Sequence, residues 1–141
     1  MAIQQLSVFI ENRPGKLVEA LETIAGAGVD LRALSLADTA DFGIMRVIVD
    51  NPEKAVKTLQ EAGYLVRSNN VIPVSIDDKP GGLVAVLRVL ADAGIDVEYA
   101  YAFVAHGKDK AYVILRVADN DEAEKTLRDS GVALLSDEAL V

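Results

Sequence analysis

The feature that most constrains this 141-residue chain is an internal repeat. The stretch Asn12–Leu17 lies between an apolar alternating run and an amphipathic helical pattern, and it recurs as Asp78–Leu83. The two prolines of these stretches lie 66 positions apart, and the same spacing relates Gly28 to Gly94. Since a long internal repeat is one folding unit used twice, the sequence predicts two domains of the same fold.

Each copy has the same order of predicted elements, because apolar alternation indicates strands and apolar residues three or four apart indicate helices. The first copy has strand 3–10, a helix opened by Pro14, hairpin strands 31–37 and 44–49 joined by a turn at 40–43, a helix begun by Asn51-Pro52, and strand 64–66. The second copy has strand 71–76, a helix opened by Pro80, hairpin strands 97–105 and 110–117, a helix capped by Asn120, and strand 132–135. This β-α-β-β-α-β order predicts an α+β fold of two ferredoxin-like domains, each an antiparallel sheet with both helices on one face.

The boundary between the copies falls in a short polar stretch near residues 68–70, so the predicted domains are residues 1–69 and 70–141. If helices cover only one face of each sheet, the other apolar face needs a partner, either the other repeat or another chain. Tyr99, Tyr101 and Phe103 alternate along one predicted strand. We interpret them as part of a sheet-to-sheet interface rather than an RNA-stacking platform, because basic residues do not surround them.

Composition excludes several classes of function. The formal net charge of −8 argues against a nucleic-acid or anionic-membrane partner. Cysteine is absent, and neither a leader pattern nor a membrane-spanning apolar run is found, so we expect a soluble cytoplasmic protein. The only histidine, His106, lies in a predicted turn, and Asp77-Asp78 has too few further ligands for a metal. We therefore predict a protein without catalytic activity, cofactor or metal.

The repeated turn has the chemistry of a small-anion site. The first backbone N–H groups of a helix lack intrahelical acceptors, and the aligned peptide dipoles favour a carboxylate or phosphate there. Arg13 and Lys16 add positive charge in the first copy, whereas Asp78 and Asp77 make the second copy less favourable. The same pattern is also an ordinary way to turn from a strand into a helix, so the turn alone leaves both interpretations open.

Taken with its spacing and duplication, the pattern resembles the ACT domain. The resemblance rests on Asn12–Leu17 followed by Ala27–Leu31, and on Asp78–Leu83 followed by Ala93–Val97, and it covers essentially the whole chain. It implies a stand-alone tandem ACT protein that is regulated by a small molecule, usually an amino acid. It further implies that the ligand is held at an interface between ACT domains, within a homodimer.

Carried over by position, the resemblance assigns ligand binding to the turn before the first helix of each copy and to the start of the second strand. These residues are Asn12, Arg13, Pro14, Gly15, Lys16, Leu17, Asp30 and Leu31, and Asp78, Lys79, Pro80, Gly81, Gly82, Leu83, Asp96 and Val97. The strand-start position is often Asn in the family but is Asp in both copies here, which leaves the identity of the ligand open. The alternative function is a regulatory subunit that docks on a separate biosynthetic enzyme, such as an aspartate kinase or acetolactate synthase.

Overall fold

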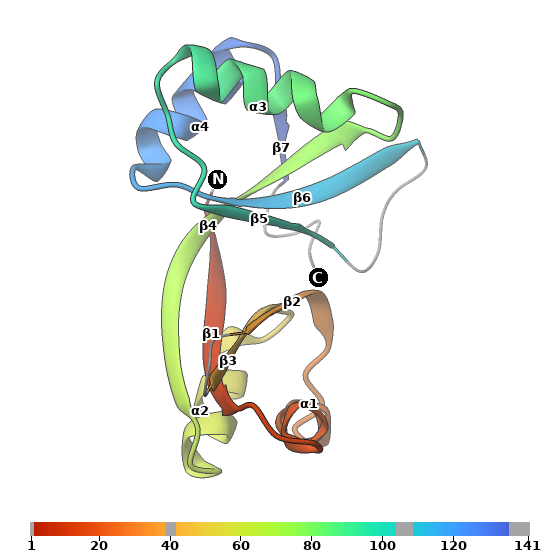
Figure 1. Cartoon of the computed structure of the whole chain (residues 1–141), viewed down its shortest axis with the longest axis vertical. Coiled ribbons are helices and arrows are strands. Elements are labelled where there is room, and N and C mark those ends of the chain that lie inside the picture. Colours follow the sequence, from red (N-terminus) through yellow and green to blue (C-terminus); the bar gives the residue numbers. More distant parts are fainter. Residues whose placement is uncertain (1, 39–41, 104–108, 136–141) are drawn as a thin grey trace. The chain divides into compact units, whose positions relative to one another are not determined.

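The structure, a computed structural model, describes residues 2–38, 42–103 and 109–135. The chain forms two compact units, one of residues Gln4–Asn69 and a second that begins at Asn70 and includes Ile3. Each unit consists of an antiparallel sheet with two helices on one face, as the sequence predicts (Figure 1).

In the first unit, the strands have the order β4-β1-β3-β2. The elements are β1 (Ile3–Glu11), α1 (Lys16–Gly26), β2 (Leu31–Asp38), β3 (Phe42–Val49), α2 (Pro52–Glu61) and the first part of β4 (Leu65–Asp77). The last residue of β1, Glu11, lies opposite Phe42 of β3, and Gly43 lies opposite Asp38 of β2. The end of β1, the start of β3 and the end of β2 therefore lie side by side.

The second unit repeats this order as β7-β4-β6-β5. Its elements are the remainder of β4, α3 (Gly82–Asp92), β5 (Tyr99–Ala102), β6 (Lys110–Arg116), α4 (Asn120–Asp129) and β7 (Ala133–Leu134). Asp77 lies opposite Lys110, as Glu11 lies opposite Phe42 in the first unit. This shared register allows the two copies to be compared position by position.

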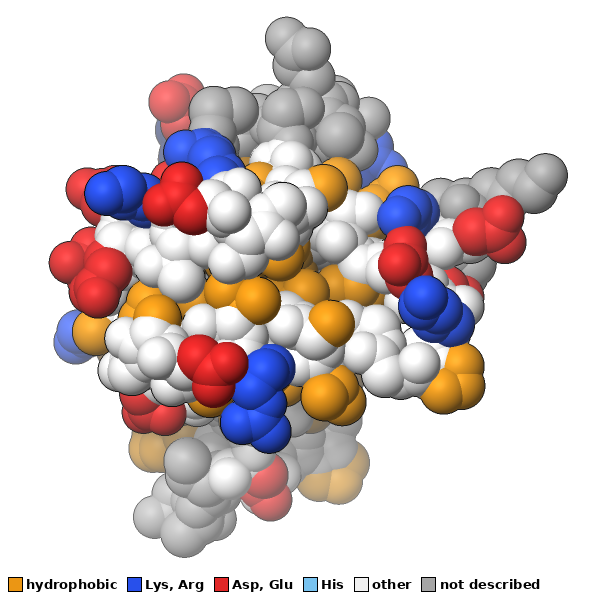
Figure 2. Space-filling model, turned by 90° about the horizontal axis from the view of Figure 1, so that it is seen from above, with side chains coloured by type: hydrophobic (Ala, Val, Ile, Leu, Met, Phe, Trp, Pro, Cys, Tyr) orange, Lys and Arg blue, Asp and Glu red, His pale blue; other side chains and the backbone are white. Residues whose placement is uncertain are grey.

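Each unit has its own apolar core between the sheet and its helices. In the first unit, the alternating residues Leu6, Val8 and Ile10 of β1 pack with Ile24 of α1 and Leu59 of α2. The second core is built in the same way from strand residues and the inner faces of α3 and α4. Figure 2, which views the second unit over its helices, shows hydrophobic side chains gathered between them and charged side chains around the margin. The tyrosines Tyr99 and Tyr101 stack on the other face of the sheet, with ring centroids 6.4 Å apart.

The prediction of two separate strands, 64–66 and 71–76, on either side of the polar residues 68–70 is wrong. These residues lie within β4, which is a continuous strand of 13 residues. Side chains hold this polar stretch in place: Gln4 donates to the Ser68 hydroxyl at 2.8 Å, and Gln5 donates to the Asn69 amide oxygen at 3.1 Å. The polar side chains of this stretch are therefore hydrogen-bonded to β1, and they do not interrupt the strand.

Several element ends also differ from the prediction. Asp119, not Asn120, is the N-cap of α4, since its carboxylate accepts from the Glu122 N–H at 3.1 Å. Strand β5 begins at Tyr99, two residues after the predicted start, and Tyr64 precedes β4. Residues 40–41 of the predicted first turn and residues 104–108, with His106, lie outside the described residues.

Candidate functional site

The repeated Pro-Gly stretch is a β-turn that ends before the helix. The N–H of Lys16 donates to the carbonyl of Arg13 at 3.2 Å, and Gly15 has φ 86° and ψ −14°. A proline followed by a residue with positive φ is the signature of a type II turn. The prediction that Pro14 and Pro80 are the first helical residues is therefore wrong, because a left-handed glycine separates each proline from its helix.

The N-terminus of α1 retains the capacity to bind an anion. The carbonyl of Gly15 accepts from the Glu19 N–H at 3.0 Å, which closes the first helical turn. Side chains do not cap this end of the helix among the described residues. The N–H groups of Leu17 and Val18 therefore have no intrahelical acceptor, and they carry the positive end of the helix dipole.

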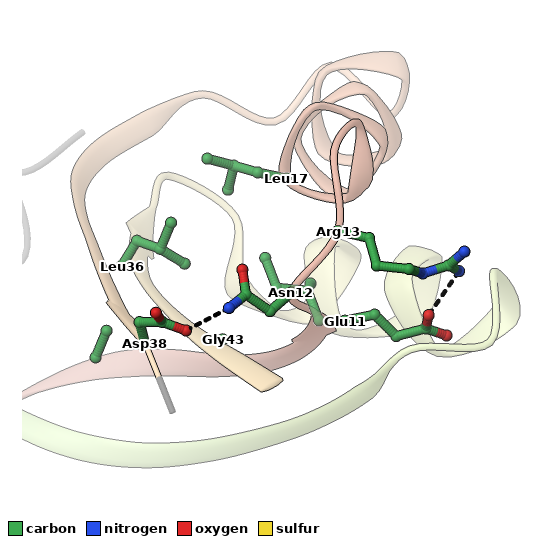
Figure 3. Close-up of a pocket in the computed structure, with 9 residues that line it drawn as sticks. Glu11, Asn12, Arg13, Leu17, Leu36, Asp38 and Gly43 are labelled. Atoms are coloured by element: carbon green, nitrogen blue, oxygen red, sulfur yellow. Dashed lines mark hydrogen bonds and ion pairs between the residues drawn. The ribbon is translucent and has the colours of Figure 1, made fainter. Parts of the chain in front are cut away.

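Beside this helix end lies a hollow of about 210 Å³, which we call the Asn12 hollow. It is lined by Ile10, Glu11, Asn12, Arg13, Leu17, Leu36, Ala37, Asp38 and Gly43. The side-chain amide of Asn12 donates to the Asp38 carboxylate at 2.7 Å. Figure 3 shows that Leu17 and Leu36 border the same space as the Asn12–Asp38 pair, so a polar end and an apolar wall face each other.

The two cations of this turn already have partners within the chain. The Arg13 guanidinium pairs with Glu11 at 2.5 Å and extends away from the Asn12–Asp38 pair (Figure 3). The Lys16 ammonium pairs with Glu19 at 3.2 Å. The positive field expected from these side chains is therefore balanced by carboxylates, and the helix N–H groups become the main donors for an anion.

The second turn is more closed than the first. A Cβ added to Gly82 would lie 2.1 Å from the backbone oxygen of Asp77, whereas Lys16 carries a side chain at the matching position. Asp77 also accepts from the Lys110 ammonium, and this hydrogen bond is the main reason that the pKa of Asp77 is lowered. The backbone of Asp77 thus lies close against the second turn, which leaves less room for a ligand there.

The predicted strand-start residues lie elsewhere in each unit. Asp30 pairs with Arg32 at 3.1 Å, and it lies at the opposite end of β2 from Asp38, roughly 25 Å of strand away. Asp96 precedes β5 and lines an acidic hollow together with Glu98, Asp119 and Glu122. Within either unit, therefore, the structure does not bring the strand-start residues to the turn.

Six lining residues were not predicted from the sequence: Ile10, Glu11, Leu36, Ala37, Asp38 and Gly43. At Gly43 a Cβ would lie 3.3 Å from the Leu36 side chain, so glycine leaves room for that wall of the hollow. The predicted strand order could have identified Asp38. An antiparallel hairpin beside the first strand brings the end of its outer strand next to the end of the first strand, and Asp38 occupies that position.

Comparison with known proteins agrees with this architecture. The sequence model of the ACT domain pair matches residues 1–141. The crystal structure of protein BT0572 from Bacteroides thetaiotaomicron is 36% identical, with a TM-score of 0.92, over 99% of this chain and 96% of that chain. The regulatory subunit of aspartate kinase from Thermus thermophilus, in a ligand-free form, is 20% identical with a TM-score of 0.68, over 91% and 90% of the two chains. The corresponding subunit from Thermus flavus is 17% identical, with a TM-score of 0.64, over 89% and 88%.

The fold, the repeated turn and the family match together define a tandem pair of α+β domains. The chain belongs to the ACT domain pair family. Among curated protein sequences, none matches it significantly. In the part of the chain that the structure describes, no helix is long and apolar enough to cross a membrane, and His, Asp and Glu side chains form no group suited to a metal ion.

Proposed function

We propose that this ACT domain pair is a regulatory protein that binds a small amino acid in the Asn12 hollow. The observation that carries the proposal is that the Asp38 carboxylate, fixed by Asn12, lines the same hollow as Leu17 at the uncapped N-terminus of α1. The ammonium group of an amino acid can pair with the Asp38 carboxylate, and its carboxylate can accept hydrogen bonds from the N–H groups of Leu17 and Val18.

The size of the hollow favours a small side chain. Its volume of about 210 Å³ is below the roughly 300–1,000 Å³ of sites for drug-sized ligands. Leu17 and Leu36 provide an apolar wall for the ligand side chain. The first copy supplies this site, because the second copy has Asp78 in place of Asn12 and a more closed turn.

The regulatory step would be a shift of population between two arrangements of ACT domains. A ligand changes such an equilibrium only through different affinities for the two arrangements. In the ACT arrangement that the sequence resembles, a neighbouring domain completes the pocket with its strand start, here Asp30–Leu31 or Asp96–Val97. We propose this role for those residues, within a cytoplasmic homodimer that has no catalytic activity of its own.

Isothermal titration of the folded protein with the standard amino acids tests the proposal. We expect a small amino acid to bind, and Leu36→Trp to abolish its binding. Leu36 is 50% exposed, so a larger side chain can be placed there without disturbing the core. Val84→Trp, at another exposed position, is the control that should leave binding unchanged. Absence of heat for every amino acid would refute the proposed function.

A second candidate function is a regulatory subunit that docks on a separate biosynthetic enzyme. The aspartate kinase regulatory subunits support it at the level of architecture, since the fold matches over about nine tenths of both chains. Affinity purification from the source cell distinguishes the two. One enzyme recovered in stoichiometric amount supports the docking subunit, whereas recovery of the chain alone argues against it.

A further inference from the structure

The first unit has a second hollow on the other side of the same turn, which we call the Phe42 hollow. Its volume is about 410 Å³, and its lining consists of Phe9, Ile10, Glu11, Lys16, Glu19, Phe42, Ala62, Gly63, Tyr64 and Leu65. Apart from Ile10 and Glu11, these residues are not part of the Asn12 hollow. In Figure 3 the Glu11–Arg13 pair extends to one side of the turn and the Asn12–Asp38 pair to the other.

The walls of this hollow expose apolar side chains. Phe42 is 52% exposed and Leu65 is 58% exposed, which makes them two of the five exposed large hydrophobic residues among those described. Phe9 and Tyr64 add two partly buried aromatic rings. Exposed apolar side chains gathered around a concave surface are typical of a binding site rather than of a solvated edge.

The duplication shows that the fold does not require this lining. Phe42 and Lys110 are matched by their pairing opposite Glu11 and Asp77. Tyr64 and Val132 are matched because each donates its N–H to the corresponding helix residue, Leu59 or Leu127. The remaining matches follow along the chain: Phe9 with Ser75, Lys16 with Gly82, Glu19 with Ala85, and Leu65 with Ala133. The second copy has the same fold although none of these positions carries an aromatic residue. The aromatic lining therefore belongs to the first copy alone.

The charges of the hollow indicate the chemistry of its occupant. Lys16 and Glu19 lie in the lining and pair with each other at 3.2 Å, each still partly exposed. The C-terminus of α2, at Ala62–Gly63, adds carbonyl groups at the negative end of a helix dipole. A zwitterion can replace the Lys16–Glu19 pair, with its carboxylate on Lys16 and its ammonium on Glu19. The aromatic walls then contact an aromatic side chain, since offset or edge-to-face rings attract each other.

We propose that the Phe42 hollow is a second ligand site, separate from the Asn12 hollow, that binds an amino acid with an aromatic side chain. Its volume lies within the range of roughly 300–1,000 Å³ that holds molecules of this size. Because Glu11 lines both hollows, occupancy of one can alter the other.

Titration of the full chain with L-phenylalanine tests this site, with aromatic carbon NMR as the readout. We expect the ring signals of Phe9, Phe42 and Tyr64 to shift, while those of Phe103 and Tyr112 in the second unit stay in place. Phenylacetate lacks the ammonium, phenethylamine lacks the carboxylate and glycine lacks the ring, so each should bind at least tenfold more weakly. Equal binding of phenylacetate and L-phenylalanine would overturn the zwitterion assignment.

The decisive variant is Phe42→Lys with Leu65→Ala, which gives the first copy the residues of the second. It should fold, because the second copy already accommodates Lys110 and Ala133 at these positions. We expect L-phenylalanine to bind at least tenfold more weakly to it, and binding of the small amino acid at the Asn12 hollow to persist. Leu36→Trp should instead lose binding of the small amino acid and keep binding of L-phenylalanine.

Unchanged L-phenylalanine binding in the double variant would overturn the proposal. So would a wild type that binds no L-phenylalanine but forms dimers that the double variant loses, since the patch would then be a protein interface.

Discussion

The Asn12 amide donates to the Asp38 carboxylate at 2.7 Å and thereby joins the β1–α1 turn to the last residue of β2. The pair does two things at once. It fixes a carboxylate in the hollow that Leu17 of α1 also lines, and both of its members form part of the wall of that hollow. Two residues 26 positions apart thus bring a carboxylate to the hollow beside this strand-to-helix turn.

This pair leads to the first prediction. Asp38→Asn should weaken binding of the small amino acid at least tenfold, because the ligand ammonium loses its counter-charge, and a hydrogen bond to a charged group contributes roughly 1.5–3 kcal/mol. Isothermal titration measures the change. Asp121→Asn, a carboxylate on α4 of the second unit, is the control that removes the same charge elsewhere.

Asn12→Asp gives a complementary result. It introduces the residue that the second copy has at Asp78, and it places two carboxylates within hydrogen-bonding reach of each other. Repulsion between them should open the hollow and reduce affinity. An unchanged affinity in both Asp38→Asn and Asn12→Asp would show that the pair is structural and that the ligand lies elsewhere.

The second prediction concerns the close contact at Gly82. Gly82→Ala should lower the free energy of unfolding by about 1–3 kcal/mol, the usual cost of overpacking, because its Cβ would collide with the Asp77 backbone oxygen. Urea denaturation followed by circular dichroism measures this loss. Lys16→Ala is the matched control in the first copy, and its effect should stay within about 0.5 kcal/mol.

These residues also show how far the sequence could be interpreted. Periodicity and duplication predicted both β-α-β-β-α-β units and their helix-covered face, because the strand and helix periods of apolar residues directly reflect the cores around Leu6 and Leu127. The turn was located correctly, but its type was not. Pro14 suits the first turn of a helix as well as a type II turn, and only the φ of Gly15 distinguishes them. Asp38 was missed because a lone carboxylate at a strand end is unremarkable until strand pairing brings it to Asn12.

The third prediction follows from the corrected start of α4. Asp119→Ala should cost about 1 kcal/mol of stability, the typical value for the loss of an N-cap, since the Asp119 carboxylate accepts from the Glu122 N–H. Asp119→Asn should retain most of the stability, because asparagine also accepts at this position. Thermal denaturation of both variants provides the comparison. Equal losses in the two would mean that the charge, and not the cap, stabilises the helix.

The fourth prediction is a pH dependence centred on Asp77. The hydrogen bond from the Lys110 ammonium, with the attraction between the two charges, lowers the pKa of Asp77 below its ordinary value. A carboxyl whose pKa is lower in the folded state stabilises the fold above its unfolded pKa, and this contribution is lost as the pH falls through the folded pKa. This stabilising contribution should therefore be fully present near neutral pH and absent in strong acid.

Carbon NMR of the Asp77 carboxyl group measures the titration directly, and Lys110→Met should return the pKa toward its ordinary value. Since the side chain is about half exposed, added salt should also weaken the shift. A titration that is the same in wild type and Lys110→Met would contradict the assignment, because the remaining cation, Lys79, lies 3.9 Å away and contributes less.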